Sequence, residues 1–161
     1  MINKLIILFS FCLALAACSK TTADYKCTLV ESTVVAPAAE VANLQAYITA
    51  NRPAAIQHPS GFFYEIMVNG TGTVTPAVCS TINVKYAGYL TSGYKFDERT
   101  TGVNFVLGEV IIGWQKGLPL IKKGGSINLY LPPSLGYGSA GTATIPPNSI
   151  LIFSIQLQDV L

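Results

Sequence analysis

Apolar and polar residues alternate along several stretches in the second half of the chain. In the clearest one, every second residue from 82 to 90 is apolar or small: Ile82, Val84, Tyr86, Gly88 and Leu90. A period of two residues is that of a β-strand with one buried face. The same alternation recurs at 127–131 and 151–157, and shorter apolar stretches lie at 62–68 and 103–107. The pattern predicts about five antiparallel strand segments joined by turns.

Polar residues interrupt one of these strands. Residues 94–96 turn back from the 82–90 strand, but Asp97 to Gly102 are polar or small before apolar residues resume at Val103. We therefore expect this strand to break at 97–102.

Two short helices are predicted. Pro37 suits a first helical position, and apolar residues at 41, 44, 47 and 48 fall on one side of the helix that follows. Arg52 ends it because the next residue, Pro53, disfavours helical geometry there. The apolar run at 110–114 could be the end of a strand or the start of a helix; we interpret 112–118 as a short helix. The chain is thus predicted to be α+β, with about five antiparallel strand segments, one short helix and a helical N-terminal extension.

The segment 132–147 is predicted to be an irregular loop. It contains four prolines and three glycines, which exclude a long regular element. Loops of this length in a small domain are more often functional than not.

The first residues have the pattern of an export signal. Lys4 precedes the apolar run 5–15, and two alanines precede Cys18. Residues 15–18 also resemble the bacterial lipobox, which implies cleavage before Cys18 and lipidation of that cysteine; an ordinary secretory cleavage is the alternative. We divide the chain into a signal (1–17), a lipidated tether (18–35), an extension with a short helix (36–60) and a domain (61–161). Under the enterobacterial sorting rule, Ser19 directly after Cys18 favours delivery to the outer membrane. We therefore expect the protein to be anchored there, on the periplasmic or surface side.

Charge and cysteines narrow the classes of partner and compartment. Ten Lys and Arg against eight Asp and Glu give a net charge of +2 with no basic stripe, so no nucleic-acid partner is expected. Outside the cytoplasm, Cys27 and Cys79 could form a disulfide. Two separate buried thiols are the alternative, and we favour the bridge.

The sequence offers little conventional catalytic chemistry. His58 is the only histidine and lies in a Gly/Pro-flanked turn, which favours a surface or loop role. No cluster has metal-ligand spacing and no Gly-rich phosphate loop opens a helix, so neither a metal nor a cofactor is expected.

Three ordered blocks are similar to the signatures of FKBP-type peptidyl-prolyl isomerases, the macrolide-binding immunophilins. The blocks are 84–90 with Gly93, Phe96 and Asp97; 105–108 with 110–114 and 117–118; and 131–133 with 136–138, 145–148 and 151–153. The resemblance covers about 61–161 and implies a curved sheet wrapped around a short helix, with a pocket between them.

The resemblance also implies which residues form that pocket. It assigns catalytic roles to Asp97, Tyr137 and the backbone N–H of Ile111. The N–H and the Tyr137 hydroxyl would bind substrate carbonyls, while Asp97 would form a polar wall. The substrate-binding residues would be Tyr86, Phe96, Phe105, Val110, Trp114 and Phe153. Without the motif order these aromatics would be read as core residues, and Asp97 as the cap of a turn.

The expected activity is isomerisation of X–Pro bonds in exported proteins by a lipid-anchored protein, with macrolides as possible ligands. Three departures from the family pattern bear on this: Val103 replaces a frequent aromatic, and the link 107–110 and the loop after Tyr137 are shorter than usual. They motivate an alternative, a non-catalytic module that binds proline peptides in the same pocket. A third hypothesis is a surface lipoprotein whose role is purely structural.

Overall fold

The computed structural model describes residues 27–161, so the predicted signal and Cys18 lie outside the described residues. The fold is a six-stranded antiparallel sheet with the strand order β1-β2-β5-β6-β3-β4. The strands are β1 (Ile56–Gln57), β2 (Phe63–Val68), β3 (Thr81–Leu90), β4 (Lys95–Val106), β5 (Ser126–Leu131) and β6 (Leu151–Val160). This confirms the predicted α+β fold class. The two-residue strand β1 adds one short edge strand that the alternation did not reveal.

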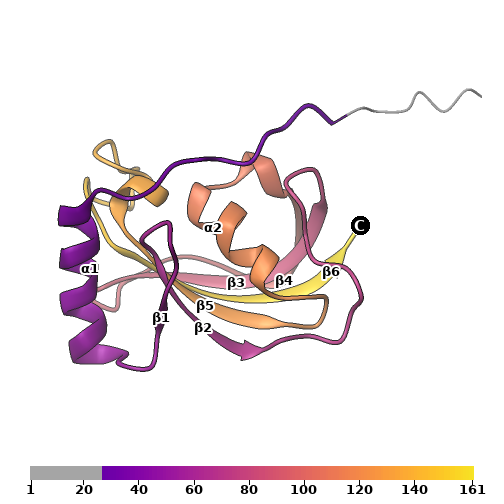
Figure 1. The fold of residues 1–161 in the computed structure, drawn as a ribbon, viewed down its shortest axis with the longest axis horizontal. Coiled ribbons are helices and arrows are strands. Elements are labelled where there is room, and N and C mark those ends of the chain that lie inside the picture. Colours follow the sequence, from indigo (N-terminus) through magenta and orange to yellow (C-terminus); the bar gives the residue numbers. More distant parts are fainter. Residues whose placement is uncertain (1–26) are drawn as a thin grey trace, which may run out of the picture.

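The short helix α2 (Ile112–Gly117) lies over one face of the sheet (Figure 1). The main core fills the space between them and includes Trp114 and Leu118, together with alternate residues of the central strands. Leu129 and Leu131 of β5 face this core, whereas Tyr130 between them faces the other side. The alternation read from the sequence therefore corresponds to the two faces of the sheet.

The N-terminal helix α1 (Ala38–Asn51) packs on the opposite face, where it confirms the predicted helical extension. Leu44 and Ile48 are fully buried one turn apart against Phe63 and Tyr130. Burying two such side chains contributes about 1.5–3 kcal/mol each, which holds the helix against the sheet. Within the described residues, no helix is long and apolar enough to cross a membrane.

The predicted break at 97–102 is wrong, because β4 runs without interruption from Lys95 to Val106. The strand stays paired with β3 through a register shift, since Val84 faces Val103 whereas Tyr86 faces Arg99. β4 is an edge strand, so its outer residues meet water and need not be apolar. The polar run thus marks an irregular, solvated edge.

Short 3₁₀ turns complete the elements: η1 (Leu107–Glu109), η2 (Leu118–Leu120) and η3 (Pro133–Leu135). The last lies within the segment that was predicted to be irregular. Two prolines precede Ser134 there, and their fixed φ suits the first residues of such a turn.

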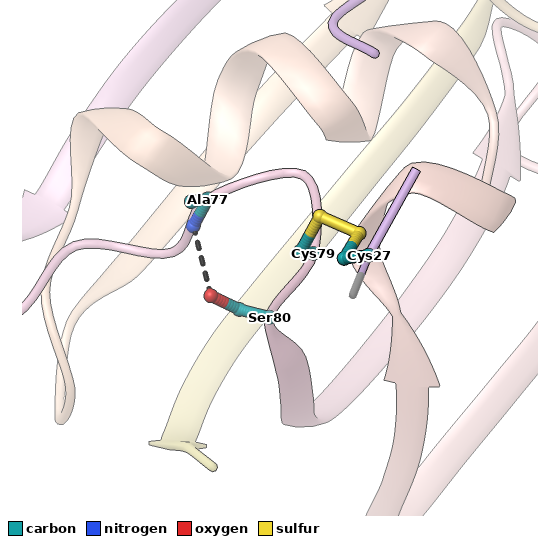
Figure 2. Close-up of a disulfide and its surroundings, with 4 residues drawn as sticks. All are labelled: Cys27, Ala77, Cys79 and Ser80. Atoms are coloured by element: carbon teal, nitrogen blue, oxygen red, sulfur yellow. Dashed lines mark hydrogen bonds between the residues drawn. A yellow bond between two sulfur atoms is a disulfide. The ribbon is translucent and has the colours of Figure 1, made fainter. Parts of the chain in front are cut away.

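The N-terminal segment is fastened to the domain at several points. Cys27 and Cys79 form a disulfide with their Cα atoms 5.9 Å apart (Figure 2). The loop that carries Cys79 is closed by a hydrogen bond from the Ala77 N–H to the Ser80 hydroxyl, 3.0 Å long. Further along the segment, Lys116 Nζ donates to the Ser32 carbonyl at 2.6 Å. Residues 27–35 of the predicted tether therefore lie against the domain.

Candidate active site

A cavity of about 440 Å³ opens between the sheet and the start of α2. It brings together every predicted pocket residue except Phe96, and it adds Arg99 and Glu109. Its walls come from β3, β4, β6, the start of α2 and the 132–147 loop, so residues far apart in the chain meet only in the folded protein. The lining residues are Tyr86, Asp97, Arg99, Phe105, Glu109, Val110, Ile111, Trp114, Tyr137 and Phe153.

Trp114 forms the floor of this cavity and is only 4% exposed. Three aromatic rings meet its indole nearly at right angles, with centroid distances of 5.0 Å to Tyr86, 5.2 Å to Phe153 and 6.1 Å to Phe105. Edge-to-face packing of this kind is favourable and directional, so the four rings hold one another in place. We call these four side chains the aromatic box. The floor that the cavity offers a ligand is therefore aromatic.

Phe96 is not among the residues that line the cavity, and its predicted role in direct binding stays a prediction. Its ring packs edge-on against Phe153 at 5.5 Å, and a side chain at Gly88 would collide with it. Phe96 therefore packs directly against one of the lining residues.

The approach of α2 to the sheet depends on Gly113. A Cβ atom at this residue would fall inside the contact distance of the δ-methyl groups of Leu131, a fully buried side chain of β5. The missing side chain lets the helix start close to the sheet and places Trp114 at the bottom of the cavity.

Asp97 is a polar residue of the cavity lining, and its carboxylate accepts three hydrogen bonds. Its donors are the Tyr86 hydroxyl at 2.5 Å, the Glu98 N–H at 2.8 Å and the Arg99 guanidinium at 3.0 Å. The carboxylate is thus committed to its neighbours and acts as a fixed negative charge. Burial and, secondly, the bond to Asp97 raise the pKa of Tyr86, so its hydroxyl stays a donor at neutral pH.

Two further donors point to a ligand-binding role. Ile111 is the N-cap of α2, and within residues 27–161 its N–H donates to no backbone carbonyl. Tyr137, in the 132–147 loop, also lines the cavity and is 40% exposed. Burial and, to a smaller extent, the charge of Asp97 raise its pKa, so this hydroxyl also remains protonated. An N–H and an O–H that both belong to the lining of one cavity can bind two carbonyl oxygens of one peptide.

Gln115 is a supporting residue that sequence reasoning missed. Its side-chain amide donates to the carbonyls of Val110, at 2.7 Å, and Gly108, at 3.2 Å. These bonds fix the short link that leads to Ile111. Gln115 lies one residue after Trp114 on α2, but no feature of the surrounding sequence predicts this contact.

His58 lies away from this cavity, in the turn between β1 and β2. Its Nδ1 accepts a hydrogen bond from the Ser60 N–H at 3.1 Å, and its ring stacks on Phe62 with centroids 4.3 Å apart. Burial and then the nearby Lys116 lower its pKa, which favours the neutral ring that this bond requires. Across residues 27–161 no group of three His, Cys, Asp or Glu side chains is arranged to hold a metal ion.

Residues 72–158 match the family described as FKBP-type peptidyl-prolyl cis-trans isomerase. The chain belongs to this family. The match confirms the family predicted from the three sequence blocks, and the matched range contains every lining residue of the cavity. α1 and the segment before it lie outside the matched range.

Curated relatives cover the same region. The FkpA isomerase of Buchnera aphidicola subsp. Schizaphis graminum is 46% identical over 104 residues, which is 63% of this chain and 41% of that protein. Escherichia coli K12 FkpA is 44% identical over 104 residues, again 63% of this chain but 38% of that protein. The chain thus spans about two fifths of the length of these relatives.

Solved structures share the fold. The crystal structure of E. coli FkpA superposes with a TM-score of 0.68 at 39% identity, covering 76% of this chain and 60% of that one. A peptidyl-prolyl cis-trans isomerase from Pseudomonas syringae pv. tomato gives a TM-score of 0.68 at 29% identity, covering 78% of this chain and 96% of that one.

Proposed function

We propose that this protein catalyses the cis–trans isomerisation of X–Pro peptide bonds. The observation that carries the proposal is the aromatic box around Trp114, flanked by the Ile111 N–H and the Tyr137 hydroxyl, in a member of an isomerase family. Rotation about this bond is opposed by amide resonance, with a barrier of about 18–20 kcal/mol. The uncatalysed step takes about 10–100 s, which leaves ample room for acceleration.

The proposed mechanism needs no bond to break. Amide resonance is lost when the X–Pro bond twists, so the transition state is less dipolar than the planar ground state. A dry aromatic pocket favours the less dipolar form, and this difference is what lowers the barrier. The Ile111 N–H and the Tyr137 hydroxyl would hold carbonyls of the peptide while it turns, and Asp97 would keep Tyr86 in place beside the proline ring.

A proline-limited peptide isomerisation assay tests the activity. We expect the purified protein to accelerate the reaction, and Tyr137→Phe to lower kcat/KM about tenfold, because one hydrogen bond to the substrate is lost. Tyr94→Phe is the matched control, since Tyr94 is exposed and does not line the cavity. A folded wild-type sample that isomerises the peptide at the uncatalysed rate would contradict the proposal.

The alternative is a module that binds proline peptides without useful turnover. Val103, where the family often has an aromatic residue, packs against the core and does not line the cavity. The cavity therefore has no aromatic side chain from this position. Measurable peptide affinity with no acceleration would select this alternative. Competition by a macrolide would show whether such ligands use the same pocket.

We further propose that the protein is lipid-anchored through Cys18 in the bacterial cell envelope and acts on exported, unfolded proteins. The export signal and the lipobox-like residues before Cys18 support this. The Cys27–Cys79 disulfide is also in keeping with a compartment outside the cytoplasm. Two or more acyl chains would give stable anchoring, and Ser19 directly after Cys18 favours the outer membrane.

Fractionation of cells that express the whole chain tests the anchor. We expect the protein in the membrane fraction and Cys18→Ala in the soluble fraction or retained as the uncleaved precursor. Mass spectrometry of the N-terminal peptide would identify the acyl chains. An unmodified N-terminus in the membrane-free fraction of wild-type cells would overturn this part of the proposal.

A further inference from the structure

A carboxylate from α1 reaches the loop that carries Tyr137. Glu40, in the first turn of α1, accepts a hydrogen bond from the backbone N–H of Ser134 at 2.9 Å. Both residues are half-buried at this contact. Figure 1 shows the start of α1 beside this loop, although more than ninety residues separate them in the chain.

This bond completes a turn that cannot complete itself. Ser134 is the second residue of η3 and follows two prolines, which have no N–H, so its N–H is the first donor of the turn. The residue that precedes the turn is Pro132, whose side chain forms no cap. A buried backbone donor without a partner is costly, and Glu40 supplies the acceptor from another element.

The 3₁₀ turn η3 also sets the position of Tyr137. The carbonyl of Pro133 accepts hydrogen bonds from the N–H groups of Gly136 and Gly138, both at 2.9 Å. These two glycines flank Tyr137 directly. The carbonyl of Gly138 also accepts from the Asn148 N–H at 2.9 Å, which ties the loop together beyond Tyr137. A displacement of η3 would therefore carry the Tyr137 hydroxyl with it.

Glu40 is itself held firmly. Leu44, one turn along α1, is fully buried, and Ile48 is 1% exposed in the same cluster. At the start of the helix, the Ala36 N–H donates to the Ser60 carbonyl at 3.0 Å. The carboxylate is thus mounted on an element that packs against the sheet independently of the loop.

We infer that Glu40 is a positioning residue for the isomerase site, through which α1 holds the Tyr137 hydroxyl where it meets the substrate carbonyl. The inference rests on the proposed function and extends it to a helix outside the family-matched range. Glu40 does not line the cavity that holds the substrate, so its effect passes entirely through Ser134 and the loop.

Three variants separate this role from a general effect on folding. Glu40→Ala removes the acceptor and is expected to lower kcat/KM about five- to tenfold at a temperature where circular dichroism shows a folded protein. Glu40→Gln keeps an oxygen that can accept the bond and should retain most of the activity. Asn43→Ala is the matched control. Asn43 lies beside Glu40 in a cleft between α1 and the loop, and its replacement should leave kcat/KM unchanged. Should Glu40→Ala fail to fold, Glu40→Asp takes its place, since its side chain is one methylene too short.

A double-mutant cycle with Tyr137→Phe decides whether the effect runs through Tyr137. With the hydroxyl already removed, Glu40→Ala should change kcat/KM by less than about twofold. Losses that multiply independently, or an equal loss in Asn43→Ala, would overturn the inference.

Binding and isomerisation measurements on the wild-type protein distinguish a failure of this inference from a failure of the proposed function. If the wild-type protein binds a proline-containing peptide without accelerating its isomerisation, the catalytic proposal fails alone. The cycle is then measured as peptide affinity, where coupling between Glu40 and Tyr137 supports the positioning role and additivity overturns it. If the protein neither binds nor isomerises the peptide, both proposals fail.

Discussion

The two tyrosines of the pocket differ in what their hydroxyl groups do. Tyr86 donates to Asp97, whereas Tyr137 lines the same cavity and is 40% exposed. Burial is the first cause of the raised pKa of both, but only Tyr86 has a carboxylate as its hydrogen-bond acceptor. Tyr86 is therefore a structural part of the wall, and Tyr137 is the group available to a ligand.

The Tyr86–Asp97 bond predicts a particular response to alkali. The pKa of Tyr86 is raised above its ordinary value of 10.0, so its contribution to stability is complete below pH 10 and is lost as the pH rises toward the folded-state value. We expect Tyr86→Phe to be less stable at neutral pH by about 1–2 kcal/mol, since a hydrogen bond to a charged acceptor is lost. Above pH 10 its stability should fall less steeply than that of the wild type.

Urea unfolding at neutral and alkaline pH measures both effects. Tyr94→Phe is the control, because Tyr94 is 55% exposed and should change neither value. Identical alkaline slopes for wild type and Tyr86→Phe would show that the bond to Asp97 does not govern the ionisation.

The position of α2 depends on the close approach at Gly113. Alanine is the better helix former by about 1 kcal/mol, so propensity alone would favour Gly113→Ala. The new Cβ, however, would meet the δ-methyl groups of Leu131 in a fully packed core, and overpacking costs about 1–3 kcal/mol. We expect a net loss of stability of about 1–2 kcal/mol and, because Trp114 moves with the helix, a lower kcat/KM.

The compensating change Leu131→Val tests this explanation. Combined with Gly113→Ala, it should be less destabilising than the sum of the two single changes, as measured by denaturant unfolding. A stabilised Gly113→Ala variant would mean that the helix can move away from the sheet at no cost.

The disulfide joins the N-terminal segment to the domain and so contributes at the level of the whole chain. It closes a loop between residues 52 positions apart. In the chain-entropy model, a loop of this size stabilises the folded state by about 4 kcal/mol. We expect Cys27→Ser to lose a stability of this order, in denaturant unfolding under oxidising conditions.

Reduction provides the matching control. A reductant should lower the stability of the wild type to that of Cys27→Ser and leave the variant unchanged. If the reductant has no effect on an oxidised wild-type sample, the cross-link does not contribute to global stability.

Much of the fold and most of the candidate site could be predicted from the sequence. Strand alternation and helix-ending prolines are local signals, and they located α1, α2, β3 and β5 to within a residue, whereas β6 extends beyond the predicted 151–157 to Val160. The ordered motifs brought together all the predicted pocket residues except Phe96. The motif order succeeds because each block supplies one wall, and the fold dictates where each block lies.

Other features depended on tertiary structure. The continuity of β4 could not be read locally, because an edge strand needs no apolar alternation on its solvated side. The packing of Phe96 against Phe153, and the presence of Arg99 in the cavity lining, depend on contacts between strands that are distant in the sequence. The contact between Glu40 and Ser134 joins elements far apart in sequence, and it arises only because α1 packs on the sheet next to that loop. Local sequence specified which segments become strands and helices; the sheet register and the docking of α1 decided which side chains meet.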